Sequence, residues 1–345
     1  MRTRLHYNIY LIVVFLALLT ACNTEVLDTN VPIVLDPVTR DVTETSRAGG
    51  SGLERNIVVC GYKTVPQGQQ YIMPKYNLTY SNGIYSYVTD SQPQVYWDNN
   101  ASEYRFWGYT GNNGIESTVD GTTIDMPVSL QKELSASLPL FSELKLITEI
   151  DYKTVELEFL HPVSKMAVMF YSEQPLADGE EISVTDITLA PKQNSQTGKV
   201  SKIWNAGIVT VNYPRNGASR ETVSVSLSNP SSVSDNLSFN DVTLTNGVGD
   251  KIDRAVYAKV PDANSNHYYS LPMGDKNPEF VLTLKIDGEE KNVIIPEQYM
   301  HWQANHGYNY IFKISGVSKN VDLYDVQVDN WHYGGDQNEE WNNWW

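Results

Sequence analysis

The sequence predicts an all-β protein with two β-sandwiches in tandem, and three observations lead to this fold class. Short runs rich in β-branched and aromatic residues recur from residue 56 onward. Several runs alternate apolar and polar residues, as EFVLTLKI (279–286) does, which is typical of a strand with one buried face. Turn dipeptides such as Asn82-Gly83 and Asp287-Gly288 separate the runs. Many short strands at this spacing indicate sandwiches.

The first 21 residues have the order of a secretory signal. Arg2 and Arg4 form a positive start, residues 9–19 are apolar, and small residues follow. An apolar run of this length is too short to span a bilayer of about 30 Å. The run ends in LTAC (19–22), which fits the lipobox of a bacterial lipoprotein, so Cys22 is the predicted lipidation site. An ordinary signal with a chance cysteine is the alternative.

Residues 22–52 are interpreted as a leader, or propeptide, rather than as a domain. The segment is polar except for one apolar patch, VPIVLD (31–36). It ends in TETSRAGGSG (43–52), in which Gly and Ser indicate an exposed hinge. A basic residue in such a hinge is an easy target for a trypsin-like protease. Arg47 is the predicted processing site, and Arg40 and Arg55 are the other candidates.

The rest of the chain is long enough for two domains of ordinary size. We expect an N-terminal sandwich over residues 53–160, a C-terminal sandwich over 161–331 and a tail over 332–345. The first contains runs such as IVVCGYK (57–63), EYRFWGY (103–109) and TVELEFL (154–160). Cys60 lies among β-branched residues, which predicts a buried, inert thiol rather than a reactive one.

The C-terminal end is unusual because a strand-like segment leads into an acidic, Trp-rich tail. NVDLYDVQVDNW (320–331) alternates as far as Trp331, which predicts Val321 and Leu323 on one face and Val326 and Val328 on the other. A tail with three tryptophans is costly to leave exposed. Two interpretations stay open. The end folds back on its own domain, or it docks into another molecule as an added strand.

The search for chemistry finds no active site. Motifs of zinc proteases, serine hydrolases and phosphate-binding loops are absent from the sequence. His301 and His306 are five residues apart, on opposite faces of a strand, and Glu156 and Glu158 share a face that is equally a solvated one. No catalytic residue, metal ligand or cofactor is predicted. With 25 basic and 41 acidic residues and no basic cluster, the chain is not expected to bind nucleic acid.

A series of motifs covers nearly the whole chain. After the lipobox and the leader sequence Ser46-Arg47-Ala48 come EYRFWGY, VELEFLHPVSKMAVMF, HWQANHGYNYIFKIS and VQVDNW. The most specific patterns are F-x-H-x-x-x-K and W-x-x-N-x-x-Y-x-Y-x-F-x-I. In this order the motifs resemble the fimbrillin-like lipoproteins, the type V pilins of Bacteroidales.

This resemblance implies two transthyretin-like β-sandwich domains and a structural or adhesive role in a cell-surface pilus. Such pilins reach the outer membrane as lipoproteins, and an arginine-specific protease removes the leader, here after Arg47. Loss of the VPIVLD strand would open a groove that a strand of the next pilin subunit fills. The candidate donor is residues 320–331, and its apolar side chains are Val321, Leu323, Val326, Val328 and Trp331.

The resemblance leaves the role within the pilus open. The tail is longer than a bare donor strand needs, which leaves a tip or accessory subunit as an alternative, with a surface glycan or protein as its partner. An anchor subunit would keep its lipid and leader. The alternative function is a non-polymerising surface lipoprotein that binds glycans through its 22 Tyr and 8 Trp residues.

Overall fold

The structure is a computed structural model. It describes residues 31–39, 56–82, 84–110, 115–118, 121–130, 138–192, 203–214, 223–245, 251–252, 255–258, 268–272 and 279–330. Apart from one 3₁₀ turn, η4 (Glu297–Tyr299), the regular structure of these residues is entirely strand. The all-β prediction is therefore confirmed.

The strands of the first part of the chain are β1 (Leu35–Thr39), β2 (Ile57–Val65), β3 (Gly68–Ser81), β4 (Ile84–Ser86), β5 (Glu103–Thr110), β6 (Glu116–Ser117), β7 (Thr123–Ser129), β8 (Phe141–Ser142), β9 (Lys145–Ile147) and β10 (Val155–Leu160). The strands of the second part are β11 (Ser164–Ser172), β12 (Glu181–Pro191), β13 (Ile203–Asn212), β14 (Ser224–Ser234), β15 (Leu237–Ser238), β16 (Val242–Thr245), β17 (Lys251–Ile252), β18 (Ala255–Ala258), β19 (Tyr268–Ser270), β20 (Phe280–Ile286), β21 (Glu289–Ile295), β22 (His306–Ser315) and β23 (Asn320–Asn330).

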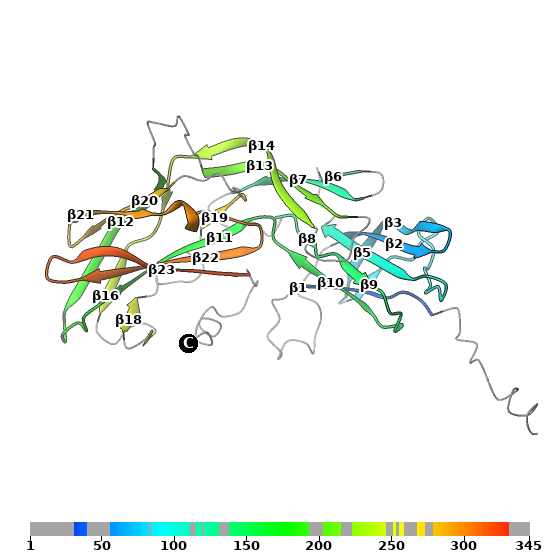
Figure 1. Ribbon diagram of the computed structural model, residues 1–345, viewed down its shortest axis with the longest axis horizontal. Helices are drawn as coiled ribbons and strands as arrows, with labels where there is room; N and C mark the ends of the chain where they lie inside the picture. Colours follow the sequence, from blue (N-terminus) through cyan, green and yellow to red (C-terminus); the bar gives the residue numbers. More distant parts are fainter. Residues whose placement is uncertain are drawn as a thin grey trace, which may run out of the picture.

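Within the described residues the strands form four sheets (Figure 1). The large sheet has the order β1-β10-β8-β5-β2-β3-β4, with β9 beside β5. The bridging sheet has the order β14-β13-β7-β6. The two C-terminal sheets have the orders β17-β18-β11-β22-β23, with β19 beside β11, and β15-β12-β20-β21, with β16 beside β12.

The large sheet is covered on both faces, which explains why its central strands do not alternate. On one face Val59 and Phe106 belong to a core that also contains Leu157. On the other face Cys60 and Trp107 pack in a second core against the bridging sheet. Strands buried on both faces read as continuous apolar runs, as β2 and β5 do.

The bridging sheet joins segments that are far apart in the sequence. β13 pairs antiparallel with β7, from Ala206↔Ser129 to Asn212↔Thr123. The hydroxyl of the buried Tyr213 donates to the carbonyl oxygen of Ser142 at 2.7 Å, which ties the hairpin to the large sheet. The β13–β14 hairpin thus completes the core of the first part although it follows residue 160. The domain bounds at 53–160 and 161–331 stay a prediction.

The C-terminal sheets pack face to face around one core. β11 and β22, which run parallel to each other, contribute side chains such as Phe170 and Phe312. β12 and β20 contribute others such as Leu189 and Leu282 from the facing sheet. β11 and β20 largely alternate buried and half-buried residues, because one face of each strand is in the core, whereas residues 308–312 of β22 are all buried.

The two most specific sequence patterns meet at the join between β10 and β11. The Oδ1 atom of Asn305 accepts a hydrogen bond from the N–H of His161 at 3.1 Å, and the N–H of Asn305 donates to the carbonyl of Val163 at 2.9 Å. The Ser164 hydroxyl donates to the carbonyl of Gln303 at 2.8 Å. The F-x-H-x-x-x-K and W-x-x-N segments therefore fix this join.

Gly121 is required by the packing behind Cys60. Its φ is +68°, and a Cβ there would lie 2.3 Å from the Cys60 Sγ. Gly316 has a similar φ of +70° with open space around it. Gly316→Ala is expected to lower the free energy of unfolding by about 1 kcal/mol. Gly121→Ala should cost about 1–3 kcal/mol more, because it adds overpacking to the same backbone strain.

Urea unfolding of the two variants and of the unchanged protein measures this difference. Equal losses for Gly121→Ala and Gly316→Ala would contradict the tight packing of Gly121 against Cys60.

Candidate functional site

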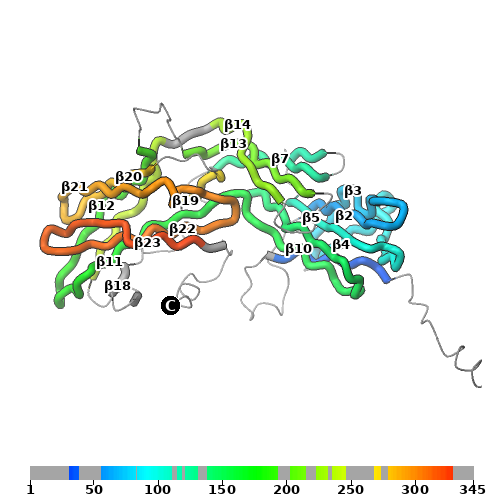
Figure 2. The backbone as a smooth tube through the Cα atoms, viewed as in Figure 1, coloured from blue at the N-terminus to red at the C-terminus, as the bar shows by residue number. Residues whose placement is uncertain are grey.

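The VPIVLD patch of the predicted leader forms part of the folded N-terminal region. β1 pairs parallel with β10, from Leu35↔Val155 to Thr39↔Phe159, and the two run side by side in Figure 2. The residues just before β1 are bonded on the other side, where the N–H of Ile33 donates to the carbonyl of Val95 at 2.9 Å. Residues 31–33 thus pair with residues 95–97, and residues 35–39 pair with β10. We call this place the leader site.

The inward face of the leader segment fills the core beneath the site. Ile33 is fully buried and Leu35 is nearly so, and both join a cluster that contains Trp97 and Phe159. The Tyr87 hydroxyl donates to the carbonyl of Ile33 at 2.9 Å. Full burial of an aliphatic side chain of this size contributes about 1.5–3 kcal/mol. The leader is therefore a structural component of this core.

The covalent connection of β1 to the rest of the fold is long. β1 precedes β2 in the chain, but β10, β8 and β5 lie between them in the sheet. At about 4.8 Å per strand, the connection from Thr39 to Ile57 crosses about 19 Å. Arg40, Arg47 and Arg55 all fall in this connection. A cut there would leave β1 held by non-covalent contacts alone.

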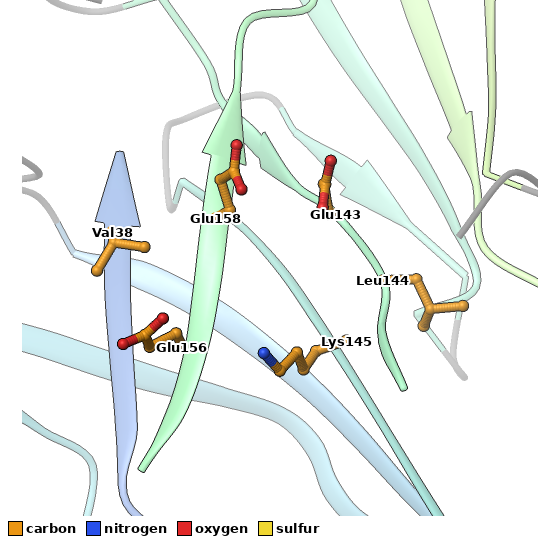
Figure 3. A pocket seen from close by; sticks show the side chains of 6 residues that line it. All are labelled: Val38, Glu143, Leu144, Lys145, Glu156 and Glu158. Atoms are coloured by element: carbon orange, nitrogen blue, oxygen red, sulfur yellow. The ribbon is translucent and has the colours of Figure 1, made fainter. Parts of the chain in front are cut away.

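The outward face of the leader site is rich in carboxylates. The parallel register sets Asp36 beside Glu156 and Val38 beside Glu158. A shallow hollow of about 110 Å³, shown in Figure 3, is lined by Val38, Glu143, Leu144, Lys145, Glu156 and Glu158. Burial, and then the charge of Glu156, raise the pKa of Asp36 above its ordinary value of 3.8.

Several predicted site residues lie outside the described residues, namely Cys22, Arg40, Arg47, Arg55 and Trp331. Lipidation and processing therefore stay predictions.

The predicted donor strand is β23, the edge strand of its sheet. It pairs antiparallel with β22 from Ser315↔Asn320 to His306↔Asn330. A register shift opposite Ile311 and Phe312 leaves Tyr324 as an extra residue. Because of this bulge, Val321, Leu323 and Val326 all pack against the same core. The predicted separation of Leu323 and Val326 onto opposite faces is therefore wrong, since strict alternation does not allow for an inserted residue.

The outer edge of β23 borders an open groove. This groove, of about 540 Å³, lies between β21 with the following η4 turn and residues 321–326 of β23. Ile294 and Tyr324 on its two walls are about half exposed, and Val328, farther along β23, is 52% exposed. The groove has two sheet edges as its sides. It could admit an extended chain by main-chain pairing.

Other reactive groups give no sign of catalysis. Cys60 is buried, and burial raises its pKa to about 11, which agrees with the predicted inert thiol. Among the described residues, His, Cys, Asp and Glu side chains do not gather in any group of three or more that could hold a metal ion. A search of the same residues reveals no helix long and apolar enough to cross a membrane.

Comparisons with known proteins identify a family and several similar structures. A family model described as fimbrillin-like matches residues 46–331. A fimbrial protein from Bacteroides vulgatus ATCC 8482 is similar in structure, with 12% identity, a TM-score of 0.46, and coverage of 87% of this chain and 99% of that one. A fimbrial assembly protein from Parabacteroides distasonis ATCC 8503 has 11% identity, a TM-score of 0.38, and coverage of 86% and 98%. The search of curated proteins found no match.

The described residues thus form an elongated, all-β fold (Figure 1). The chain belongs to the fimbrillin-like family, because the family model covers most of its length. The resemblance stated from the sequence motifs is therefore confirmed. Membership supports a non-enzymatic role in a cell-surface appendage.

The side of the leader site formed by residues 95–97 and Tyr87 was not predicted from the sequence. Residues 95–97 and Tyr87 lie in a stretch between turn signals that was not recognised as a partner for the leader. Trp97 in QVYWD (94–98) was the available signal, because a Trp flanked by Val and Tyr in a short loop needs a core to pack into. The parallel partner β10 was predicted as a strand, but its pairing with the leader could not be read from one sequence.

Removing the buried anchor of the leader should loosen it selectively. Ile33→Ala is expected to lower the free energy of opening residues 31–39 by about 2–5 kcal/mol, because it leaves a cavity in the core. Val34→Ala is the matched control on the same segment, since Val34 is 51% exposed, and should change it by at most about 0.5 kcal/mol. Amide hydrogen exchange of residues 31–39 measures both. Equal effects would contradict the inward packing of Ile33.

Proposed function

We propose that this protein is a structural or adhesive subunit of a cell-surface pilus. It would be exported as an outer-membrane lipoprotein anchored at Cys22, cut after Arg47, and assembled with other subunits by strand exchange. Family membership supports the pilus role. The signal-like sequence of residues 1–22 supports the lipoprotein stage.

The observation that carries the proposal is the position of β1. It contributes Ile33 and Leu35 to the core, yet it is an edge strand with one strand neighbour, β10. Its connection to β2 contains the three candidate arginines. A cut in this connection turns β1 into a separate peptide that can leave the site. Its departure exposes apolar surface and backbone groups. One of them is the N–H of Val155, which donates to the carbonyl of Val34 while the leader is in place.

The incoming strand would come from residues 320–331 of the next subunit. Val321, Leu323 and Val326 are only half-buried, so detaching β23 from β22 exposes less apolar surface than detaching a central strand. An added strand restores main-chain bonds at an open edge, and its alternate side chains fill the pockets left by Ile33 and Leu35. Because donor and acceptor are different surfaces, repeated contacts form a filament rather than a closed dimer.

Limited digestion of the purified, unlipidated protein with an arginine-specific protease tests the processing step. We expect one cut, after Arg47, followed by multimers that survive detergent in unboiled electrophoresis. Arg47→Lys keeps the charge but removes the cut, and the ladder with it. Arg40→Lys and Arg55→Lys are the matched controls and should still be cut and assemble.

A clean cut without a ladder would redirect the proposal to a tip or accessory subunit. Resistance of Arg47 together with a monomeric protein would contradict it, and would favour the glycan-binding surface lipoprotein, to be tested by a glycan screen.

The donor role of β23 is tested by a charge on its exposed apolar side chain. Val328→Asp should abolish the ladder, because a carboxylate would enter an apolar pocket of the neighbouring subunit. It should change the free energy of unfolding of the monomer by about 0.5 kcal/mol or less, since Val328 is half exposed. Val317→Asp, in the fully exposed turn before β23, is the control and should assemble normally. A ladder from Val328→Asp would exclude Val328 from the donor interface.

A further inference from the structure

The leader strand places a carboxylate against a carboxylate. In the parallel pair β1–β10, Asp36 and Glu156 occupy the same register position. Leu35 and the buried Val155 point into the core, so the residues that follow each of them lie on the outward face. Like charges directly opposite each other on neighbouring strands destabilise the pairing.

The other charged groups at this face do not cancel the repulsion. Glu158, two residues beyond Glu156, and Glu143 line the same hollow. The hollow contains one described cation, Lys145 of β9, which Figure 3 shows across β10 from β1. Lys153, just before β10, is held by Asp151 at 2.8 Å. The segment 95–97, on the far side of the leader, has no charged residue.

The proton affinity of Asp36 is altered in the direction expected from this geometry. Partial burial is the larger cause of its raised pKa, and the charge of Glu156 adds to it. Asp36 therefore resists ionisation when β1 is docked. Docking is most favourable below the ordinary pKa of 3.8, weakens as the pH rises through the raised value, and carries the whole penalty at neutral pH.

We infer that the charge of a strand determines how tightly it binds in the leader site. Because Asp36 lies opposite Glu156, the leader itself binds there weakly at neutral pH. The apolar side chains of the leader hold it in place during folding, while the paired carboxylates favour its departure. A strand with an uncharged or basic residue opposite Glu156 would bind the same site more tightly. This inference rests on the proposed exchange of β1 for its biological meaning, but the repulsion itself can be measured without any exchange.

Amide hydrogen exchange of residues 31–39 in the uncut, unlipidated protein tests the repulsion. At pH 7, Asp36→Asn should slow exchange about two- to fivefold, the range that surface charge pairs produce. Glu156→Gln should have a similar effect. The double variant should slow exchange no more than the larger single one, because both changes remove the same interaction. Glu116→Gln on β6, which does not pair with β1, is the matched control and should leave these residues unchanged.

The pH dependence supplies a second measurement. After correction for intrinsic exchange, lowering the pH from 7 to 4 should slow exchange of residues 31–39 in the unchanged protein more than in Asp36→Asn. Unchanged or faster exchange in both Asp36→Asn and Glu156→Gln at pH 7 would overturn the inference. Additive slowing in the double variant would also overturn it, since the two carboxylates would then act separately.

The same variants separate this inference from the proposed function. Slower hydrogen exchange in Asp36→Asn would support the repulsion. If the protein without substitutions then forms no ladder after cleavage, strand exchange would be contradicted while the repulsion stands. If a ladder does form, Asp36→Asn should assemble more slowly after cleavage, because its leader leaves the site more slowly.

Discussion

The architecture depends on the burial of β2 and β5 on both faces. A strand covered on one side needs one partner layer, but these two need a layer on each side. The bridging sheet supplies one. The other is a core to which the leader, the loop carrying Trp97 and the inward face of β10 contribute. The large sheet is therefore the common wall of two cores, and the leader belongs to the core that contains Trp97.

The leader combines a well-buried inward face with an outward face that carries like charges. Its inward side chains are as well buried as those of permanent strands, whereas its outward face carries an acidic residue beside another acid. Burial of the inward side chains makes the leader part of the N-terminal core. Under the proposed function, the outward charges and the single neighbouring strand would favour departure of the leader after cleavage. Apolar contacts and electrostatics act on opposite faces of one strand, so each can be changed without the other.

Much of the fold could be predicted from the sequence, because alternation and turn dipeptides report local structure. EFVLTLKI and IVVCGYK appear as strands at the predicted places. What could not be predicted depends on pairing between distant segments. The return of β13 to β7, the parallel partner of β1 and the bulge at Tyr324 leave no periodic signal in one sequence. Trp97 and Asn305 illustrate the same limit. The sequence marks each of them as unusual, but it does not reveal which distant residues they contact.

The bridging hairpin also determines when the first half of the protein can finish folding. The core behind Cys60 and Trp107 includes Val209 and Val211, which follow the end of β5 by about 100 residues and the end of β2 by about 145. Until then that face of β2 and β5 is covered only in part, by β7 side chains such as Ile124 and Met126. A polypeptide ending near residue 160 would leave that face without the side chains of β13 and β14. The first part of the chain therefore completes its core only with residues that follow residue 160.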